Sequence, residues 1–134
     1  GNIVAKNIST FFMFLGQAEE AMNLYMSAFD NSEITSIAKY GPDGPGAEGT
    51  VMRADFTLNG KEYICIDSPA VHEFSFTPSM SLFVECEDNA EIDKLCEKLS
   101  QGGEYLMPPD NYGFSTKFAW LNDKFGVSWQ LNLA

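Results

Sequence analysis

Apolar and polar residues are spaced along the first half of the chain in the patterns of strands and one helix. The continuous apolar run of residues 10–15 is typical of a strand that is covered on both faces. Residues 18–29 then have their apolar positions at helical spacing. Asn59-Gly60 between two apolar runs is a strong signal for a hairpin turn. Three strands are therefore predicted after the helix, at residues 34–40, 51–58 and 62–67.

The second half repeats this order of elements. Residues 79–85 read as a strand, and Asp88 followed by Glu91 predicts a capped helix start. Gly102-Gly103 predicts where this helix ends. The apolar stripe of the helix consists of Ile92, Leu95, Cys96 and Leu99. Strands are predicted at residues 105–107, 114–121 and 127–133, with residues 108–111 as a loop.

The two halves have the same order of elements, and residues at corresponding positions of these elements also align. Phe12 and Met22 align with Leu82 and Ile92, seventy positions later. The stretch Thr57-Leu58-Asn59 is echoed by Trp120-Leu121-Asn122. Internal repeats are among the more informative signals of fold in one sequence. We therefore predict a single α+β domain over residues 1–134, built from two βαβββ modules at about 1–70 and 71–134.

Composition and charge narrow the classes of partner. The formal net charge of -11 argues against nucleic acid, whose binding requires lysine and arginine at phosphates. No apolar run reaches the length of a membrane span, so no membrane partner is expected. Three cysteines without a CxxC pair, in a sequence without a secretory leader, predict reduced thiols in a cytoplasmic protein.

Three stretches carry a resemblance to a known family: residues 14–21, residues 40–52 and residues 120–130. They resemble the vicinal oxygen chelate superfamily, which includes glyoxalase I, extradiol dioxygenases and bleomycin-resistance proteins. The closer similarity is to its PhnB-like branch, often labelled demethylubiquinone methyltransferase-like. That family pattern usually has Cys-Gly before the first tryptophan of the last stretch, where this chain has Phe118-Ala119. The resemblance implies curled mixed sheets around a cavity and a homodimer, but no settled activity. Sheet edges are normally covered, and pairing of two identical chains, with module exchange as one route, would cover them.

Strand alternation predicts which residues line such a cavity. We expect the helices to cover the purely apolar face of each sheet and the cavity to take the other face, which is aromatic with a few polar groups. Asp67 and Gln130 are then expected at equivalent positions of the two modules. The predicted ligand-binding residues are Thr10, Phe12, Phe14, Cys65, Ser79, Trp120 and Gln130.

The resemblance also indicates where a metal would bind. Metal-dependent relatives place four ligands in the cavity, and local alignment puts these positions at Thr10, Asp67, Ser79 and Gln130. Only Asp67 is a strong ligand for a divalent ion, because Gln130 is a neutral donor and hydroxyls add little. We therefore expect no metal and no other cofactor, although a weak site that uses Asp67 and Gln130 stays open.

Three functions are compatible with these residues. The first is binding or sequestering of a small molecule in a metal-free pocket. The second is a lyase, isomerase or dioxygenase-like enzyme with Asp67 as the catalytic acid or base, with or without metal assistance. The third is a structural interaction module. Cys65 has no histidine nearby to activate it as a nucleophile, and His72 is expected at the surface or at a gate of the pocket.

The glycine- and proline-rich residues 41–46 superficially resemble a phosphate-binding loop. Such loops join a strand to a helix, so that the helix N-terminus meets the phosphate. These residues lead instead to another predicted strand, and proline removes backbone donors. No nucleotide-binding turn is predicted elsewhere, which argues against methyl transfer despite the label of the similar family.

Overall fold

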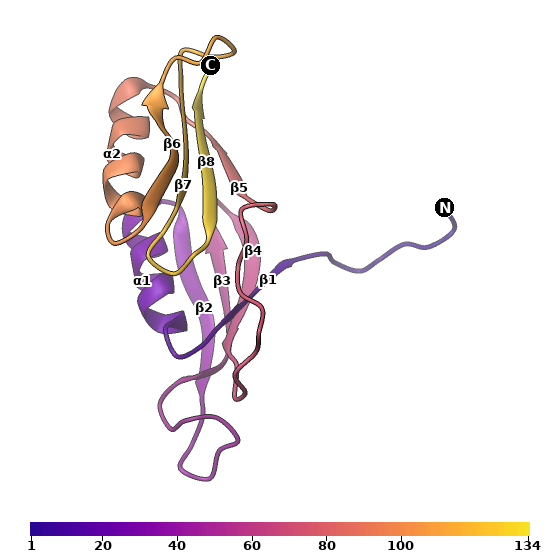
Figure 1. The fold of residues 1–134 in the computed structure, drawn as a ribbon. Coiled ribbons are helices and arrows are strands. Elements are labelled where there is room, and N and C mark those ends of the chain that lie inside the picture. The colour runs from indigo at the N-terminus through magenta and orange to yellow at the C-terminus, as the bar shows by residue number, and fades with distance from the viewer. The chain divides into compact units, whose positions relative to one another are not determined.

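The computed structural model describes residues 1–134 and divides them into two units, Gly1–Val71 and His72–Ala134. Each unit has the order strand, helix, strand, strand, strand, which confirms the predicted pair of βαβββ modules (Figure 1). The first unit contains β1 (Thr10–Phe14), α1 (Ala18–Ala28), β2 (Ser32–Lys39), β3 (Val51–Leu58) and β4 (Lys61–Asp67). The second contains β5 (Leu82–Glu85), α2 (Asn89–Ser100), β6 (Glu104–Asp110), β7 (Lys117–Asn122) and β8 (Ser128–Leu133).

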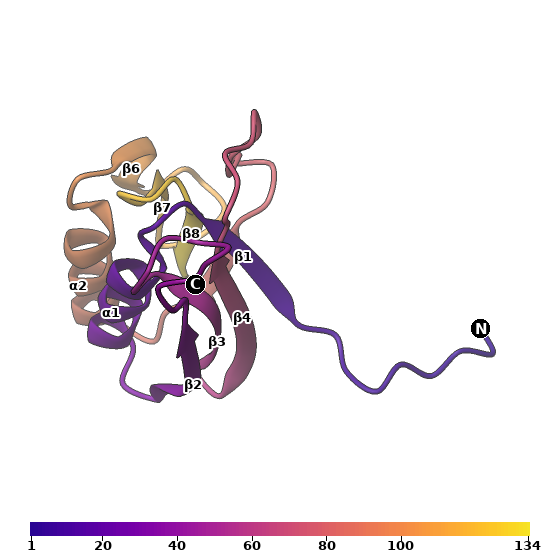
Figure 2. The same cartoon turned by 90° about the horizontal axis from the view of Figure 1, so that it is seen from below.

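Each unit forms one four-stranded mixed sheet. The strand orders are β1-β4-β3-β2 and β5-β8-β7-β6, and the first strand of each unit pairs with the last in parallel. The β3–β4 hairpin turns at Asn59-Gly60, where both residues have positive φ, as the two-residue turn requires. Figure 2 shows each helix lying along one face of the sheet of its own unit. Neither helix is long and apolar enough to span a membrane.

The two helices begin in different ways. The Oδ1 atom of Asp88 accepts a hydrogen bond of 2.8 Å from the amide of Glu91, so the predicted cap of α2 is confirmed. Helix α1 follows Gln17, whose side chain makes no cap hydrogen bond. The predicted apolar stripe of α2 is buried. In α1, Ala21, Met22 and Tyr25 are buried, whereas Phe29, the last residue of the predicted helix 18–29, lies just after the end of α1.

In the first unit, α1 covers the face of the sheet that carries Phe12 and Phe14. These two residues pair with Cys65 and Asp67, so all four side chains point to the same side. Phe12 is 6% exposed, whereas its neighbour Phe11, on the opposite face, is 50% exposed. The predicted assignment of faces is therefore wrong by one residue in this half, because the aromatic set forms the core and not the open face.

In the second unit the predicted alternation holds. Leu82 pairs with Trp129 on the buried side, where Lys117 on β7 also reaches Asp93 on α2 at 3.0 Å. Phe83 pairs with Gln130 on the opposite, open face. Since the pair of Phe12 and Cys65 corresponds to that of Leu82 and Trp129, the counterpart of Asp67 is Leu131. The predicted equivalence of Asp67 with Gln130 is therefore wrong.

The boundaries of three strands differ from the sequence prediction by three residues at one end. Strand β6 runs through Pro108 and Pro109, which were expected in a loop. It is an edge strand with two register shifts, and such strands tolerate proline because one side makes no ladder hydrogen bonds. Strands β5 and β7 begin later than predicted, at Leu82 and Lys117.

The corrected face assignment predicts opposite outcomes for two adjacent phenylalanines. Phe12→Ala should lower the free energy of unfolding by about 3–5 kcal/mol, because it removes a buried ring and leaves a cavity. Phe11→Ala, the matched control on the exposed face, should change it by less than about 1 kcal/mol. Urea denaturation monitored by circular dichroism measures both. Equal costs, or the reverse order, would contradict the assignment.

Candidate functional site

Asp67 lies at the end of β4, is 2% exposed, and accepts three hydrogen bonds from the backbone. Its Oδ1 atom accepts from the amides of Gly16 at 2.7 Å and Ala18 at 3.0 Å. Its Oδ2 atom accepts from the amide of Val51 at 2.8 Å. The carboxylate therefore supplies the cap that Gln17 does not give to α1, and its negative charge favours this end of the helix dipole.

This geometry favours a structural role for Asp67 over the predicted role of acid or base. Both oxygens are occupied by backbone donors, and the residue lies beneath α1. The hydroxyl of Tyr40 also donates to the backbone carbonyl of Asp67, which ties the β2–β3 connection to the same point. A substrate would have to displace these contacts before it could exchange a proton with Asp67.

Three of the four positions that the sequence resemblance indicates for metal ligands are engaged in other hydrogen bonds. Asp67, the one strong ligand, has both oxygens engaged by amides. The hydroxyl of Ser79 is bonded to Thr77, and the Gln130 amide nitrogen donates to Ser81. The chain contains no group of three or more histidine, cysteine, aspartate or glutamate residues arranged to hold a metal ion.

The cysteines are buried and unpaired. Burial, followed by the negative charges of Asp67 and Asp55, raises the pKa of Cys65 to about 12. Burial likewise raises the pKa of Cys86 to about 12 and that of Cys96 above its usual value. Because the thiolate is the nucleophilic form, these environments do not suit nucleophilic catalysis. Cys65 lies under α1, so the predicted cavity position for it is wrong.

The open face of the second sheet carries a chain of four hydrogen-bonded side chains. The Nε2 atom of Gln130 donates to the hydroxyl of Ser81 at 3.2 Å. The hydroxyls of Ser81 and Ser128 share a hydrogen bond of 2.7 Å. The indole nitrogen of Trp120 donates to Ser128 at 2.9 Å. Two predicted ligand-binding residues, Trp120 and Gln130, are thus brought together by two serines.

Some hydrogen-bond donors and acceptors of these four side chains are not used within the group. Each serine oxygen accepts one hydrogen bond, from Gln130 or from Trp120. The bond between Ser81 and Ser128 uses only one of their two hydroxyl hydrogens, so one hydroxyl donor is left over. The amide oxygen of Gln130 is left as an acceptor. The second hydrogen of the Gln130 amide is also unused, so the group holds two unused donors and one unused acceptor without a formal charge. Ser128 itself is 2% exposed.

Aromatic side chains lie on the same face of the sheet as these polar atoms. Phe83 pairs directly with Gln130 and is 54% exposed. Its ring lies 6.5 Å from that of Phe118, which also contacts Phe114 edge-on at 5.0 Å. A few polar groups set in an aromatic surface are the usual composition of a site for small organic molecules.

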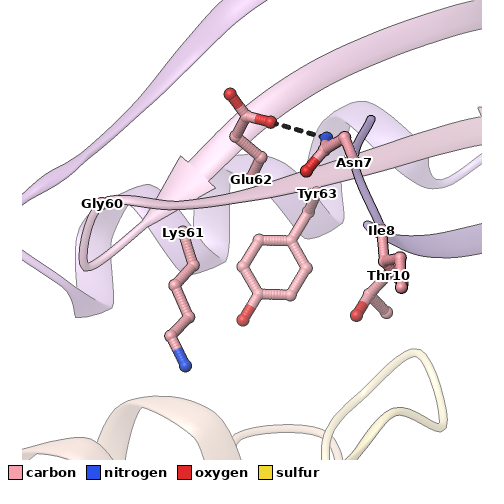
Figure 3. A pocket seen from close by; sticks show the side chains of 7 residues that line it. All are labelled: Asn7, Ile8, Thr10, Gly60, Lys61, Glu62 and Tyr63. Atoms are coloured by element: carbon pink, nitrogen blue, oxygen red, sulfur yellow. Dashed lines mark hydrogen bonds between the residues drawn. The ribbon is translucent and has the colours of Figure 1, made fainter. Parts of the chain in front are cut away.

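The other predicted residues lie elsewhere. Ser79 is exposed in the segment before β5, and the ring of His72 stacks on Phe74 at 4.6 Å. Thr10 lies in the first unit, at a depression of about 510 Å³ beside β1 and β4 (Figure 3). This depression is lined by Asn7, Ile8, Thr10, Gly60, Lys61, Glu62 and Tyr63.

Sequence reasoning gave no role to Asp123, the residue that organises the β7–β8 turn. It is 3% exposed, and its Oδ1 atom accepts from the amides of Phe125 and Val127. Its Oδ2 atom accepts from the indole nitrogen of Trp129 at 3.0 Å. An aspartate that begins a turn with glycine three residues later is a recognisable signal for such bonds. Asp123 therefore fixes the start of β8, from which Ser128 and Gln130 project.

Comparisons with solved structures identify the fold. A glyoxylase/bleomycin resistance protein/dioxygenase domain from Frankia sp. EAN1pec is 14% identical, with a TM-score of 0.66, over 98% of this chain and 93% of that chain. The fosfomycin resistance protein FosX from Mesorhizobium loti is 12% identical, with a TM-score of 0.61, over 97% and 92%. The chain therefore has the glyoxalase/bleomycin resistance-like fold.

The particular family is shown by two further matches. The family model described as 3-demethylubiquinone-9 3-methyltransferase matches residues 6–132. A PhnB protein from Bacillus cereus is 61% identical, with a TM-score of 0.94, over 96% of this chain and 100% of that chain. The chain therefore belongs to this PhnB-like family. Comparison with functionally curated proteins gave no match.

Asp67 provides a direct test of the structural role. Asp67→Asn should lower the free energy of unfolding by about 2–3 kcal/mol or more, because an amide nitrogen replaces one acceptor of buried backbone donors. The exposed Asp43→Asn makes the same chemical change in a loop and should alter stability by less than about 0.5 kcal/mol. Chemical denaturation of both variants is the measurement. A D67N protein as stable as D43N would refute the role.

Proposed function

We propose that the protein binds a small, uncharged organic molecule on the open face of its second sheet. The observation that carries this proposal is the hydrogen-bonded chain of Gln130, Ser81, Ser128 and Trp120 next to the exposed ring of Phe83. The aromatic rings offer apolar area, and the polar group offers unused donors and the Gln130 oxygen as an acceptor, which orient the ligand. The proposed contacts are hydrogen bonds and apolar packing, so binding does not depend on a metal.

The local charge favours an uncharged ligand over an anion. The four side chains carry no formal charge, and the whole chain has a net charge of -11. An anion would lose its hydration in this place without gaining a cationic partner. A group with both a donor and an acceptor, such as a carboxamide attached to an aromatic ring, matches the unused hydroxyl hydrogen and the Gln130 oxygen.

Binding is better supported than catalysis by these residues. Asp67, the predicted acid or base, has both oxygens occupied by backbone amides. The residues between β2 and β3, which include 41–46, join two strands, so they lack the helix N-terminus that a phosphate-binding loop needs. The methyltransferase activity in the family name therefore has no support from this part of the chain.

Two further properties belong to the same proposal. Three buried, unpaired thiols support a reducing compartment, which we take to be the cytoplasm. The outer strands of both sheets, β1, β2, β5 and β6, each pair on one side only. Such edges are normally covered, and two-fold pairing of identical chains would cover them.

Binding can be tested with benzamide as a probe and two-dimensional NMR of 15N-labelled protein. Each tryptophan gives one indole signal, and the Trp129 indole is bonded to Asp123 in the core. Benzamide should shift the Trp120 signal and leave that of Trp129 in place. Gln130→Ala should weaken binding by about tenfold to a hundredfold, because a polar contact is worth about 1–3 kcal/mol.

Two controls accompany this measurement. Gln101→Ala removes an exposed glutamine at the end of α2 in the same unit and should leave the affinity for benzamide unchanged. Benzoate has the shape of benzamide with a negative charge, and it should not shift the Trp120 signal. A Q130A protein that binds benzamide as well as the unaltered protein would refute the site.

The assembly is tested separately. Light scattering at micromolar concentration should give about twice the mass of the 14.8 kDa chain, because the sheet edges are covered in a homodimer. A mass equal to that of one chain would contradict this expectation, and it would leave the result with benzamide unaffected.

A further inference from the structure

Three side chains at the depression of the first unit lie on the same face of its sheet. Thr10 on β1 pairs directly with Tyr63 on β4, and Lys61 lies two residues before Tyr63 on the same strand. Side chains two residues apart on a strand share a face. In Figure 3, Lys61 and Tyr63 project from one side of the strand, with Thr10 beside them, whereas Glu62 projects from the other side.

None of these three groups has a hydrogen bond or ion pair within the chain. Lys39, Arg53 and Lys117 each pair with a carboxylate, whereas Lys61 does not. The nearest acid in sequence, Glu62, accepts a hydrogen bond of 3.0 Å from Asn7 on the opposite face. An ammonium group and two hydroxyls thus lie at one depression with their donors unused.

Tyr63 is held in place by its ring. The ring stacks on Phe56 at 5.4 Å and on Phe12 at 5.9 Å between centroids. Burial also raises the pKa of Tyr63 above its usual value, so its hydroxyl keeps the proton that it can donate. A donor that is already fixed before a ligand arrives loses little conformational freedom on binding.

We propose that Lys61, Tyr63 and Thr10 bind the carboxylate of a small organic acid at this depression. One lysine matches the single charge of a carboxylate, whereas a phosphate dianion would add an unmatched charge to a chain of net charge -11. The volume of about 510 Å³ is within the range of small-molecule sites, so the remainder of the acid has room beside Ile8. This site is independent of the open face of the second sheet.

The test uses benzoate as the probe and benzamide as its uncharged counterpart, with two-dimensional NMR of the labelled protein at constant ionic strength. Benzoate should shift the backbone amides of Gly60, Lys61 and Tyr63 in a saturable manner, and benzamide should not. Lys61→Gln should weaken benzoate binding by roughly tenfold or more, because charge-assisted hydrogen bonds are the stronger ones. Tyr63→Phe keeps the ring stack and should weaken binding by a smaller factor.

Lys94→Gln is the matched control, since it removes the same charge from an exposed position of α2 and should leave the benzoate affinity within about twofold. Unfolding curves of all variants show whether each is folded. Shifts that do not saturate, or a K61Q protein that binds benzoate unchanged, would overturn the proposal. Stronger binding of inorganic phosphate than of benzoate at the same amides would overturn the assignment of a carboxylate.

Discussion

The first unit depends on the carboxylate of Asp67. Its two oxygens accept hydrogen bonds from the amides of the turn before α1, of the first residue of that helix and of the first residue of β3. Asp67 itself is the last residue of β4. Three segments that are distant in sequence, around residues 16–18, at Val51 and at Asp67, therefore meet at one side chain. A buried charge is tolerated here because each oxygen is hydrogen-bonded and because the helix N-terminus carries a partial positive charge.

The second unit reaches the same architecture by different local means. Its helix is capped from within its own sequence by Asp88, and the position equivalent to Asp67 is the apolar Leu131. A buried aspartate is present here too, but Asp123 organises the β7–β8 turn instead of the helix start. The repeat thus conserves the order of elements and the pairing of strands, whereas the polar contacts that fix them differ.

The residues on the open face of each sheet are less restricted by packing than those on its covered face. The covered face must fill the space under a helix at close packing, which restricts it to residues such as Phe12 and Phe56 in one unit and Trp129 and Leu131 in the other. The open face of the second sheet carries Ser81, Ser128 and Gln130 in hydrogen-bonded contact. Polar groups that could recognise a ligand can therefore occupy this face without disturbing the core.

The sequence by itself determined the two modules, the spans of both helices to within a residue or two, the Asn59-Gly60 hairpin and the cap at Asp88, because these follow from local periodicity and turn chemistry. Alternation also placed Gln130 on the open face. Only the tertiary structure decided which face of β1 is covered. The run from Thr10 to Leu15 is apolar on both sides, and alternation separates the two faces without indicating which one the helix covers. The role of Asp67 was also settled by the tertiary structure, because the amides that it binds are brought to it by segments far away in the chain.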